Sequence, residues 1–403
     1  MDLLSQPLVE NDRLETSSLE QEEDVSSSDE SKRRQVPTLV IIVVSLIGLV
    51  VVLFIAAVFL PPEPARAAAK SPLRVFVLAG QSNMVGHGFI SKKDGGGKEL
   101  NGTLESLINM YPDQFGMLKA EKAENGKESS PLRASTLSSS PWTVREDVLI
   151  VCNHQYYVDP SIEKAPKLKG NLYAGLCGGD DDEVQMGPEL GFGWSVGDAL
   201  NTKGDKILIV KIAWGGKSLE VDFRPPSSGG NTGPYYTTMI NDIKNFLASV
   251  SEYFPEEHDR PVLLSGFGWH QGWNDLINIT AAADYEKNLA NLIRDIRRDL
   301  DVSDLPVAIA SSGMVSANDS TEVGEVVHAE LAVARYPEFN ETVTSVDTRG
   351  FRRGPPPASP GDADYHWNNN AESYWLIGRS LGNAMVELVR RRESTRSASI
   401  RLR

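Results

Sequence analysis

Cysteine is scarce in this chain, which has only Cys152 and Cys177 among its 403 residues. A disulfide-rich scaffold is therefore excluded, because such folds need several bridges. The sequence has no close cluster of several cysteines and histidines, which argues against a structural zinc site with four closely spaced ligands. The pair fits either one disulfide in an oxidising compartment or two buried thiols.

Basic residues are in the minority, with 40 Lys and Arg against 55 Asp and Glu and a formal net charge of −15. The sequence has no basic stripe interleaved with aromatic residues, so we expect no nucleic-acid partner. Aromatic residues are missing from residues 1–31, which carry ten acidic residues and one basic residue. Such a composition cannot bury a core, and we expect residues 1–35 to be a disordered acidic tail.

Charge is missing from residues 39–60, LVIIVVSLIGLVVVLFIAAVFL. As a helix rising about 1.5 Å per residue, this stretch would span roughly 33 Å, enough to cross a lipid bilayer. We predict an uncleaved transmembrane anchor over residues 36–60, followed by a linker over residues 61–73. The alternatives are a buried core helix, which the lack of a polar face disfavours, and a cleaved signal peptide, whose apolar region would be shorter and nearer the N-terminus.

The charges that flank this span predict its orientation. Lys32, Arg33 and Arg34 precede it closely, whereas Arg66 and Lys70 lie farther from its other end, so we expect the N-terminus in the cytoplasm. All four N-x-Ser/Thr sequons lie after the span, at Asn101, Asn278, Asn318 and Asn340. They favour an extracytoplasmic or lumenal location for the C-terminal part.

Residues 74–390 are long enough to form a substantial core. Five short apolar runs have the length of buried parallel strands, at residues 74–80, 206–216, 261–272, 305–313 and 342–347. Three patterns typical of amphipathic helices lie between or after them, at residues 188–201, 281–300 and 371–392. This alternation predicts an α/β domain with a mostly parallel sheet.

Residues 91–186 do not follow the alternation. They are polar and rich in Gly and Ser, with segments such as DGGGK, LSSSP and GGDDDE. We interpret them as a long insertion between the first strand and the helix at residues 188–201. After the last helix, the arginine-rich residues 391–403 are expected to be a solvated basic tail.

Polar residues suited to catalysis follow the predicted strands. In doubly wound sheets, functional residues gather at the carboxyl ends of the strands. One further candidate is a histidine late in the chain, in the segment DADYHWNNNAE. The candidates are Gln81, Ser82, Asn83, Trp214, Gly216, Gln271, Trp273, Asn274 and His366.

This set of residue types suits acyl transfer. A serine hydroxyl becomes a nucleophile when an imidazole accepts its proton, and Ser82 with His366 can supply both groups. The backbone N–H groups of Ser82 and Gly216, with a side-chain N–H of Gln271 or Asn274, can hold the oxyanion. This chemistry needs no metal and no organic cofactor. The Gly-x-Ser-x-Met pattern lacks the last glycine of the α/β-hydrolase elbow, so we do not assign that fold.

Four ordered segments resemble a known family: GQSNM at 80–84, KIAWGGKSL at 211–219, WHQGWND at 269–275 and His-x-Asn at 366–368. Together they resemble the SGNH (GDSL-type) hydrolases, and within these the sialate O-acetylesterase and carbohydrate esterase family six group, over roughly residues 74–390. The resemblance implies a flavodoxin-like three-layer α/β/α sandwich, a metal-free Ser–His–Asp apparatus and removal of acetyl groups from sugars. It makes Ser82 the nucleophile and His366 the base.

Two positions depart from this pattern. Trp273 stands where the sialate-esterase group usually has an acid, and position 363, where the family's orienting acid usually lies, is alanine. We predict that Asp364 orients His366 instead. Asp362, Asp275 and a Ser–His dyad without an acid are the alternatives.

Side chains beside the predicted nucleophile are expected to contact the substrate. These are Gln81, Asn83, Trp214 and Trp273. The two tryptophans either stack on sugar rings or belong to the core, since tryptophan is highly buried on average. His270 either lines the site or completes a strand end, and His87 is expected near Ser82 without a chemical role.

We therefore predict a membrane-anchored serine esterase that removes O-acetyl groups from a sialic acid or a polysaccharide. One alternative is an esterase that acts on lipids or on longer acyl chains. The other is a non-catalytic glycan-binding module, which the missing acid at position 363 would fit. The presence of both Ser82 and His366 favours an enzyme, because binding alone would not need them.

Overall fold

The computed structural model describes residues 45–51, 70–120, 141–155, 168–179, 184–201, 204–314 and 321–401. The chain divides into two compact units, residues 1–67 and residues 68–403. In the first unit residues 45–51 are helical, whereas the rest of the predicted anchor, the acidic tail and residues 61–69 of the linker lie outside the described residues. Within the described part, no helix is both long enough and apolar enough to cross a membrane.

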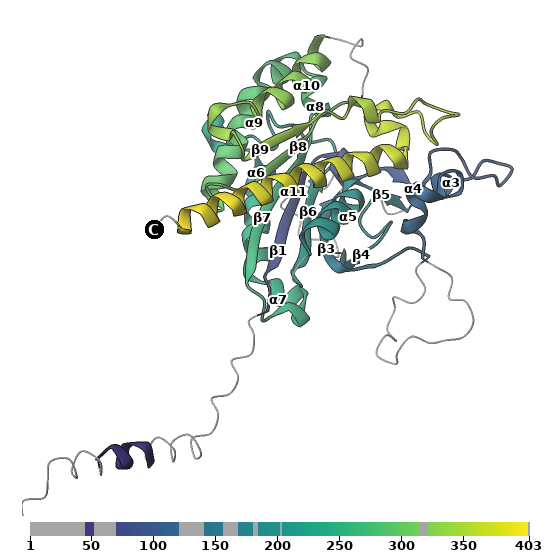
Figure 1. The fold of residues 1–403 in the computed structure, drawn as a ribbon. Helices are drawn as coiled ribbons and strands as arrows, with labels where there is room; N and C mark the ends of the chain where they lie inside the picture. The colour runs from purple at the N-terminus through teal and green to yellow at the C-terminus, as the bar shows by residue number, and fades with distance from the viewer. Residues whose placement is uncertain are drawn as a thin grey trace, which may run out of the picture. The chain divides into compact units, whose positions relative to one another are not determined.

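A seven-stranded sheet forms the centre of the second unit (Figure 1). Its strands lie in the order β4 (Leu168–Leu172), β3 (Arg145–Gln155), β6 (Lys206–Trp214), β1 (Leu73–Gly80), β7 (Val262–His270), β8 (Val307–Ala310) and β9 (Val343–Val346). Neighbouring strands are parallel except for the antiparallel pair β3 and β4. The prediction of a mostly parallel sheet in an α/β fold is confirmed.

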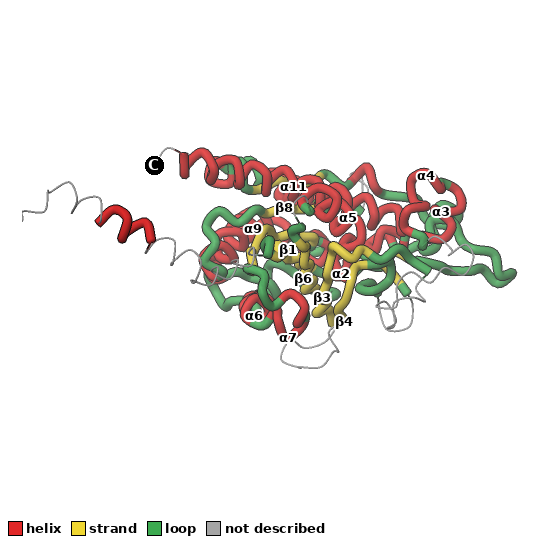
Figure 2. Tube along the Cα trace, turned by 60° about the horizontal axis from the view of Figure 1, so that its bottom comes forward, coloured by secondary structure: helices red, strands yellow, loops and turns green. Residues whose placement is uncertain are grey.

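Helices cover both faces of this sheet. One face packs against α6 (Pro234–Ala248), α9 (Ile279–Asp299) and α10 (Thr321–Val333), and the other against α5 (Pro188–Leu200) and α11 (Ala371–Arg401). Figure 2 shows the strands between α11 on one side and α6 on the other. The domain is therefore a sandwich of three layers.

Short elements connect these layers. The short α-helices are α2 (Ser82–Val85), α3 (Leu104–Met110), α4 (Pro112–Phe115), α7 (Val250–Tyr253) and α8 (Trp273–Leu276). The 3₁₀ turns are η1 (Gly116–Leu118), η3 (Pro226–Ser228), η4 (Pro255–Glu257), η5 (Pro337–Phe339), η6 (Arg349–Phe351) and η7 (Asp364–Asn369). A two-stranded antiparallel ribbon joins β2 (Gly88–Phe89) to β5 (Gln185–Met186).

Strand β1 illustrates why the sheet is buried on both faces. Val75 and Val77 belong to the core under α6 and α9, whereas Phe76 and Leu78 belong to the core under α5 and α11. Successive side chains of a strand point to opposite faces, and all four of these are fully buried. A continuous apolar run of this kind is typical of a strand with helices on both sides.

Helix α9 follows its predicted pattern closely. Tyr285, Leu289 and Ile296, spaced at helical intervals, are fully buried. The helix begins after Asn278, whose side chain accepts hydrogen bonds from the first backbone N–H groups and so caps the helix.

Residues 91–186 contribute more to the fold than the sequence predicted. The apolar run VLIVC at residues 148–152 lies in β3, which pairs with β6 inside the main sheet. The insertion therefore supplies a core strand, and its polar flanking segments hid this strand in the sequence. Residues 121–140, 156–167 and 180–183 of this region lie outside the described residues.

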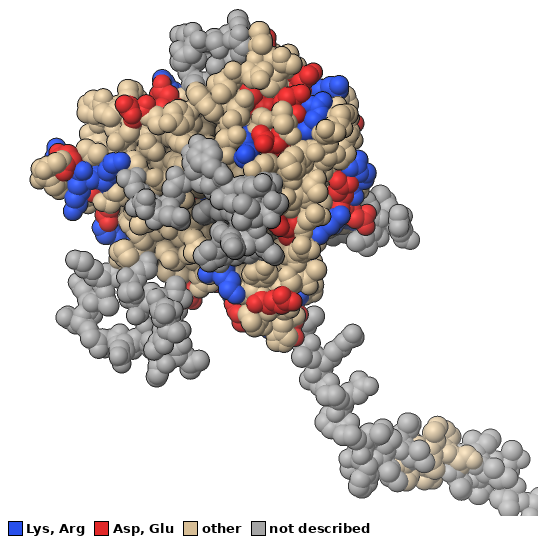
Figure 3. All heavy atoms as spheres, turned by 180° about the vertical axis from the view of Figure 1, so that it is seen from behind, with Lys and Arg blue, Asp and Glu red and all other residues tan. Residues whose placement is uncertain are grey.

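Helix α11 also extends farther than predicted, from residue 371 to Arg401 instead of residue 392. Ion pairs join its C-terminal part to the domain: Arg392 to Asp304 at 2.6 Å, and Glu393 to Arg74 at 2.6 Å. The expected basic tail is thus helical as far as Arg401. On the face in Figure 3, blue basic and red acidic side chains likewise lie next to one another.

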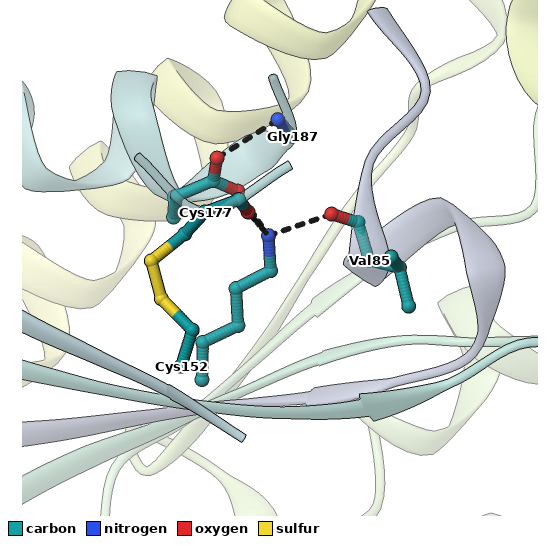
Figure 4. Close-up of a disulfide and its surroundings, with 6 residues drawn as sticks. Val85, Cys152, Cys177 and Gly187 are labelled. Atoms are coloured by element: carbon teal, nitrogen blue, oxygen red, sulfur yellow. Dashed lines mark hydrogen bonds and ion pairs between the residues drawn. A yellow bond between two sulfur atoms is a disulfide. The ribbon is translucent and has the colours of Figure 1, made fainter. Parts of the chain in front are cut away.

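Cys152 of β3 and Cys177 form a disulfide whose Cα atoms are 6.1 Å apart (Figure 4). Of the two states that the sequence left open, the structure has the bonded one. The bridge links the main sheet to the segment that leads into β5.

Candidate active site

Ser82 lies where β1 ends and α2 begins. Glycine is required at the preceding Gly80, because a Cβ there would lie 2.0 Å from the backbone oxygen of His270 at the end of β7. Ser82 is 4% exposed. Its backbone N–H is the first of α2, where helices leave such groups unsatisfied, and it has no hydrogen-bond partner among the described residues.

The buried side chain of Gln81 joins the end of β1 to the end of β7. Its Oε1 accepts hydrogen bonds from Gln271 Nε2 at 3.0 Å and from the Gly272 N–H at 3.2 Å. Its Nε2 donates to Asn274 Oδ1 at 3.1 Å. The predicted substrate contact through Gln81 is therefore not supported, because its amide is used to orient Asn274.

Asn274 keeps one side-chain hydrogen available. Its Nδ2 carries two hydrogens and donates one of them to Gly216 O at 3.0 Å. Gly216 turns the chain after β6 with a φ of 69°, and its N–H has no partner in the described part of the chain. The N–H groups of Ser82 and Gly216 and the side chain of Asn274 thus provide donors suited to an oxyanion.

Gln271 cannot supply such a donor. Its Nε2 is within hydrogen-bond distance of Gln81 Oε1, of Lys217 O at 3.0 Å and of Asp275 Oδ2 at 2.6 Å. These acceptors already use both of its hydrogens. Of the two amides that the sequence offered for the oxyanion, the structure therefore favours Asn274.

Asp275 anchors the loop that follows β6. Its buried carboxylate accepts the N–H of Leu219 at 2.8 Å and that of Glu220 at 2.9 Å, as well as Gln271 Nε2. Burial raises the pKa of Asp275 to about 6, although these hydrogen bonds act in the opposite direction. Asp275 makes no hydrogen bond to His366, so its candidacy as the orienting acid is not supported.

His366 lies in the turn η7, followed by three residues with left-handed φ angles of 54–57°. Two of these three are asparagines, which tolerate this conformation. Asn368 Nδ2 donates to Arg353 O at 2.9 Å, and Asn369 Nδ2 donates to His87 O at 3.0 Å. The asparagine run thus fixes the turn that presents His366.

Asn83 ties the serine segment to the histidine turn. Its Nδ2 donates to Tyr365 O at 2.9 Å, and its Oδ1 accepts from the Tyr374 hydroxyl at 2.8 Å. This use of both ends of the amide does not support the predicted substrate contact through Asn83. Although the two segments are joined, Ser82 Oγ and the His366 ring share no hydrogen bond in the structure.

No carboxylate orients His366 within the described residues. Asp364, the predicted acid, is 49% exposed and pairs with Arg352 at 3.3 Å instead, and Asp362 is exposed to solvent. The prediction for Asp364 is therefore not supported, because its side chain pairs with Arg352.

Aromatic rings pack against His366 instead. The His87 ring stacks on it with the centroids 3.8 Å apart and the planes 12° from parallel. The Tyr365 ring meets it edge-on at 4.5 Å. Burial, with His87 acting in the same direction, lowers the pKa of His366 to about 3. His366 is thus neutral at neutral pH, the form in which it can accept a proton.

The other histidine of the motifs serves the fold. His270 is fully buried, and its Nδ1 bonds to Ala310 O at 3.0 Å. Of its two predicted roles, the structure supports the completion of a strand end. The described residues hold no group of three or more Cys, His, Asp or Glu side chains that could bind a metal ion.

The two candidate tryptophans differ in placement. Trp214 is 2% exposed and packs against Phe223 and Tyr235 in the core, so its predicted sugar contact is not supported. Trp273 is partly exposed, and its ring centroid lies 5.5 Å from that of Tyr365, which is 45% exposed. The sequence prediction missed Tyr365, although an aromatic residue next to His366 in a polar segment could have suggested it.

Residues 72–387 match the family described as carbohydrate esterase, sialic acid-specific acetylesterase. A probable carbohydrate esterase from Arabidopsis thaliana is 27% identical over 245 residues, which cover 60% of this chain and 71% of that protein. A solved structure of an Arabidopsis thaliana protein is similar, with 18% sequence identity and a TM-score of 0.46, and the match covers 78% of this chain and 98% of that one. The structure of a carbohydrate acetylesterase from Xanthomonas citri is also similar, with 14% identity and a TM-score of 0.44, and the match covers 77% of this chain and 55% of that one. The chain is an ester-hydrolysing enzyme and belongs to the family of sialic acid-specific acetylesterases, a carbohydrate esterase family.

Proposed function

We propose that this enzyme removes O-acetyl groups from carbohydrates through an SGNH-type mechanism, with Ser82 as the nucleophile and His366 as the general base. One observation carries the proposal. Hydrogen bonds join segments that are far apart in the sequence: residues 81–83 to Asn274 and to Tyr365, and Asn274 to Gly216. These hydrogen bonds support the proposal, because the segments that carry the proposed nucleophile, base and oxyanion donors are connected at one edge of the sheet.

The reaction follows from these positions. Ser82 Oγ attacks the acetyl carbonyl carbon while His366 accepts the hydroxyl proton. The N–H groups of Ser82 and Gly216 and the side chain of Asn274 stabilise the oxyanion. His366 then gives its proton to the departing sugar oxygen, which leaves the acetyl group on Ser82. Water, deprotonated by His366, releases acetate and restores the serine.

We propose that Ser82 and His366 act as a dyad without an acid. Asp364 pairs with Arg352, and Asp275 is engaged by the loop after β6. The hydrogen bond from Ser82 to His366 would form when substrate binds, since catalytic hydrogen bonds often tighten only in the complex.

Trp273 and Tyr365 are the proposed contacts to the sugar. Their rings lie close together and partly exposed, and Tyr365 also touches the His366 ring. The flat apolar face of a sugar ring could pack on this aromatic surface while its acetyl group reaches Ser82.

Acetate release tests the proposed substrate class. The full chain would be incubated in detergent with O-acetylated sialic acid, with acetylated xylan, and with p-nitrophenyl acetate and octanoate. Ser82→Ala protein would serve as the blank. We expect Ser82-dependent acetate release from at least one carbohydrate, and slow turnover of octanoate. Rapid octanoate turnover without carbohydrate deacetylation would instead support the alternative of a lipid or long-chain esterase.

Removing the side-chain donor of Asn274 should slow catalysis. Asn274→Ala is expected to lower kcat by about 100- to 1,000-fold, the usual effect of losing one oxyanion donor, with a smaller change in KM. Steady-state kinetics with p-nitrophenyl acetate would measure this. Asn291→Ala is the matched control, because it removes a buried amide of α9 that donates to Ser228 Oγ in η3. Equal kcat in the two variants would contradict the assignment.

The pH profile should have an unusually low acid limb. His366 acts as a base only when neutral, and burial lowers its pKa from the ordinary 6.5 to about 3. As the pH falls, the neutral, active form of His366 persists below pH 6.5 and is lost only near pH 3, where the lowered pKa lies. We expect kcat/KM to stay level from pH 7 to about 5, with tryptophan fluorescence confirming the fold at each pH. A half-maximal loss between pH 6 and 7 would contradict this.

We further propose that residues 39–60 anchor the enzyme in a membrane, with the N-terminus cytoplasmic and the esterase domain extracytoplasmic or lumenal. The uncharged stretch and the preceding Lys32–Arg34 cluster support this orientation. In the described part, the sequon residues Asn101, Asn278 and Asn340 are exposed. A glycosidase-sensitive mass shift in protein from eukaryotic cells would support it, and cytosolic, unglycosylated protein would refute it.

A further inference from the structure

We propose that His87 is a positioning residue for His366, and that its stacked ring holds the imidazole in the orientation needed to take the Ser82 proton. This inference rests on the proposed function, in which His366 is the base. It assigns to a ring–ring contact the orienting role that a carboxylate usually has in such sites.

The contact between the two rings is close and nearly parallel. Their centroids are 3.8 Å apart and their planes differ by 12°, so the face of His366 rests on the face of His87. Rotation of the His366 side chain would break this contact. Within the described residues, neither ring nitrogen of His366 has a hydrogen-bond partner that could otherwise set its orientation.

His87 is itself held from two sides. Its Nδ1 bonds to Gln185 Oε1 at 3.1 Å, and its backbone oxygen accepts the hydrogen bond from Asn369, three residues after His366. Gln185 begins β5, whose partner β2 starts directly after His87. Gln185, at the end of the 91–186 insertion, thus holds the His87 ring, which in turn stacks on His366.

Close backbone packing fixes the same segment. Gly86 has a φ of 93°, and a Cβ there would lie 2.2 Å from the Cα of Gly187. Only glycine allows this approach, which places His87 between α2 and the β2–β5 ribbon. His87 therefore cannot shift easily when His366 changes its protonation state.

A neutral ring suits this role. Burial lowers the pKa of His87 to about 4, so it carries no charge at neutral pH. When His366 takes the serine proton, a neutral neighbouring ring adds no positive charge beside the resulting cation. A second positive charge in that place would oppose the proton transfer.

The test compares two variants of similar volume. His87→Leu fills the space without a flat ring, whereas His87→Phe restores a ring that can stack. We expect His87→Leu to lower kcat for p-nitrophenyl acetate by about 10- to 100-fold with little change in KM, as misplacing a catalytic group does. His87→Phe should recover kcat to within about threefold of the parent, because stacking alone is restored. His258→Ala, which removes an exposed histidine, is the control.

Each outcome has one interpretation. Full activity of folded His87→Leu protein, or equal losses in the Leu and Phe variants, would overturn the role of stacking. Thermal unfolding of each variant separates a loss of kcat from a loss of folded protein. If His366→Ala retains activity, the proposed function fails. If His366→Ala is inactive while His87→Leu is normal, only the present inference fails.

Discussion

Replacing Ser82 with alanine is expected to lower kcat/KM for acetyl esters by about four to six orders of magnitude. Alanine keeps the helix start but removes the oxygen that attacks the carbonyl. His366→Ala should have a similar effect, because the serine hydroxyl is a poor nucleophile until a base takes its proton. Acetate release and p-nitrophenyl acetate hydrolysis, measured with the same enzyme preparation, would report the loss.

The double variant provides a sharper test. The effects of groups that act as a unit are not additive, so Ser82→Ala/His366→Ala should be about as inactive as either single variant.

The variant Asp364→Asn distinguishes a dyad from a triad. Because Asp364 pairs with Arg352, we expect kcat within about threefold of the parent, whereas loss of a triad acid costs about 10⁴-fold. A fall of that size would restore Asp364 as the orienting acid. Equal activity of parent and Ser82→Ala protein would rule out this nucleophile.

Lys211→Met is expected to destabilise the domain by about 3–5 kcal/mol, the usual cost of breaking a buried ion pair. Lys211 lies in β6, an interior strand of the sheet, with 0% of its side chain exposed, and its Nζ is 2.6 Å from Glu189 Oε2. The Nζ also donates to Cys177 O and to Val85 O, the latter at 2.7 Å and drawn as a dashed line in Figure 4. Methionine would fill the space but leave the Glu189 carboxylate buried without its cation.

Urea unfolding of parent and variant would measure this loss as a lower midpoint at an unchanged slope. Adding Glu189→Gln to Lys211→Met should recover a large part of the lost stability, because this second change removes the buried charge that has no partner. The amide oxygen of the new glutamine can still accept the hydrogen bond that the Gly187 N–H now donates to Glu189 at 2.9 Å. Arg297→Met is the control: this buried cation donates to backbone oxygens only, so its removal strands no carboxylate. A Lys211→Met loss no larger than that of Arg297→Met would contradict the prediction.

The Lys211 contacts also connect the fold to the site. Val85 ends α2, the helix that Ser82 begins, and Cys177 belongs to the disulfide with β3. One buried cation thus joins α2, which begins at the proposed nucleophile, to the disulfide segment and to the start of α5. The apolar context of this lysine in KILIVKIAW is plain in the sequence, but its partners lie 22 to 126 residues away.

Much of the framework could be predicted because it depends on local patterns. Short apolar runs mark β1, β6 and β7, and helical spacing of Tyr285, Leu289 and Ile296 marks α9. Strand β3 was missed because polar segments surround it, although its core is equally apolar. Pairing with β6 decides its place in the sheet, and a pairing partner is not a local property of the chain.

The sequence by itself determined which residue types stand at the ends of β1, β6 and β7 and in the late turn η7: the serine, the glycine, the amides and the histidine of the proposed esterase site. Only the tertiary structure decided which partner each of these side chains has. It commits the hydrogens of Gln271 to neighbours and leaves one on Asn274, turns Asp364 toward Arg352, and places His87 against His366. The physical reason is that a hydrogen-bond donor or a ring face serves one partner at a time, and folding brings that partner from a distant part of the chain.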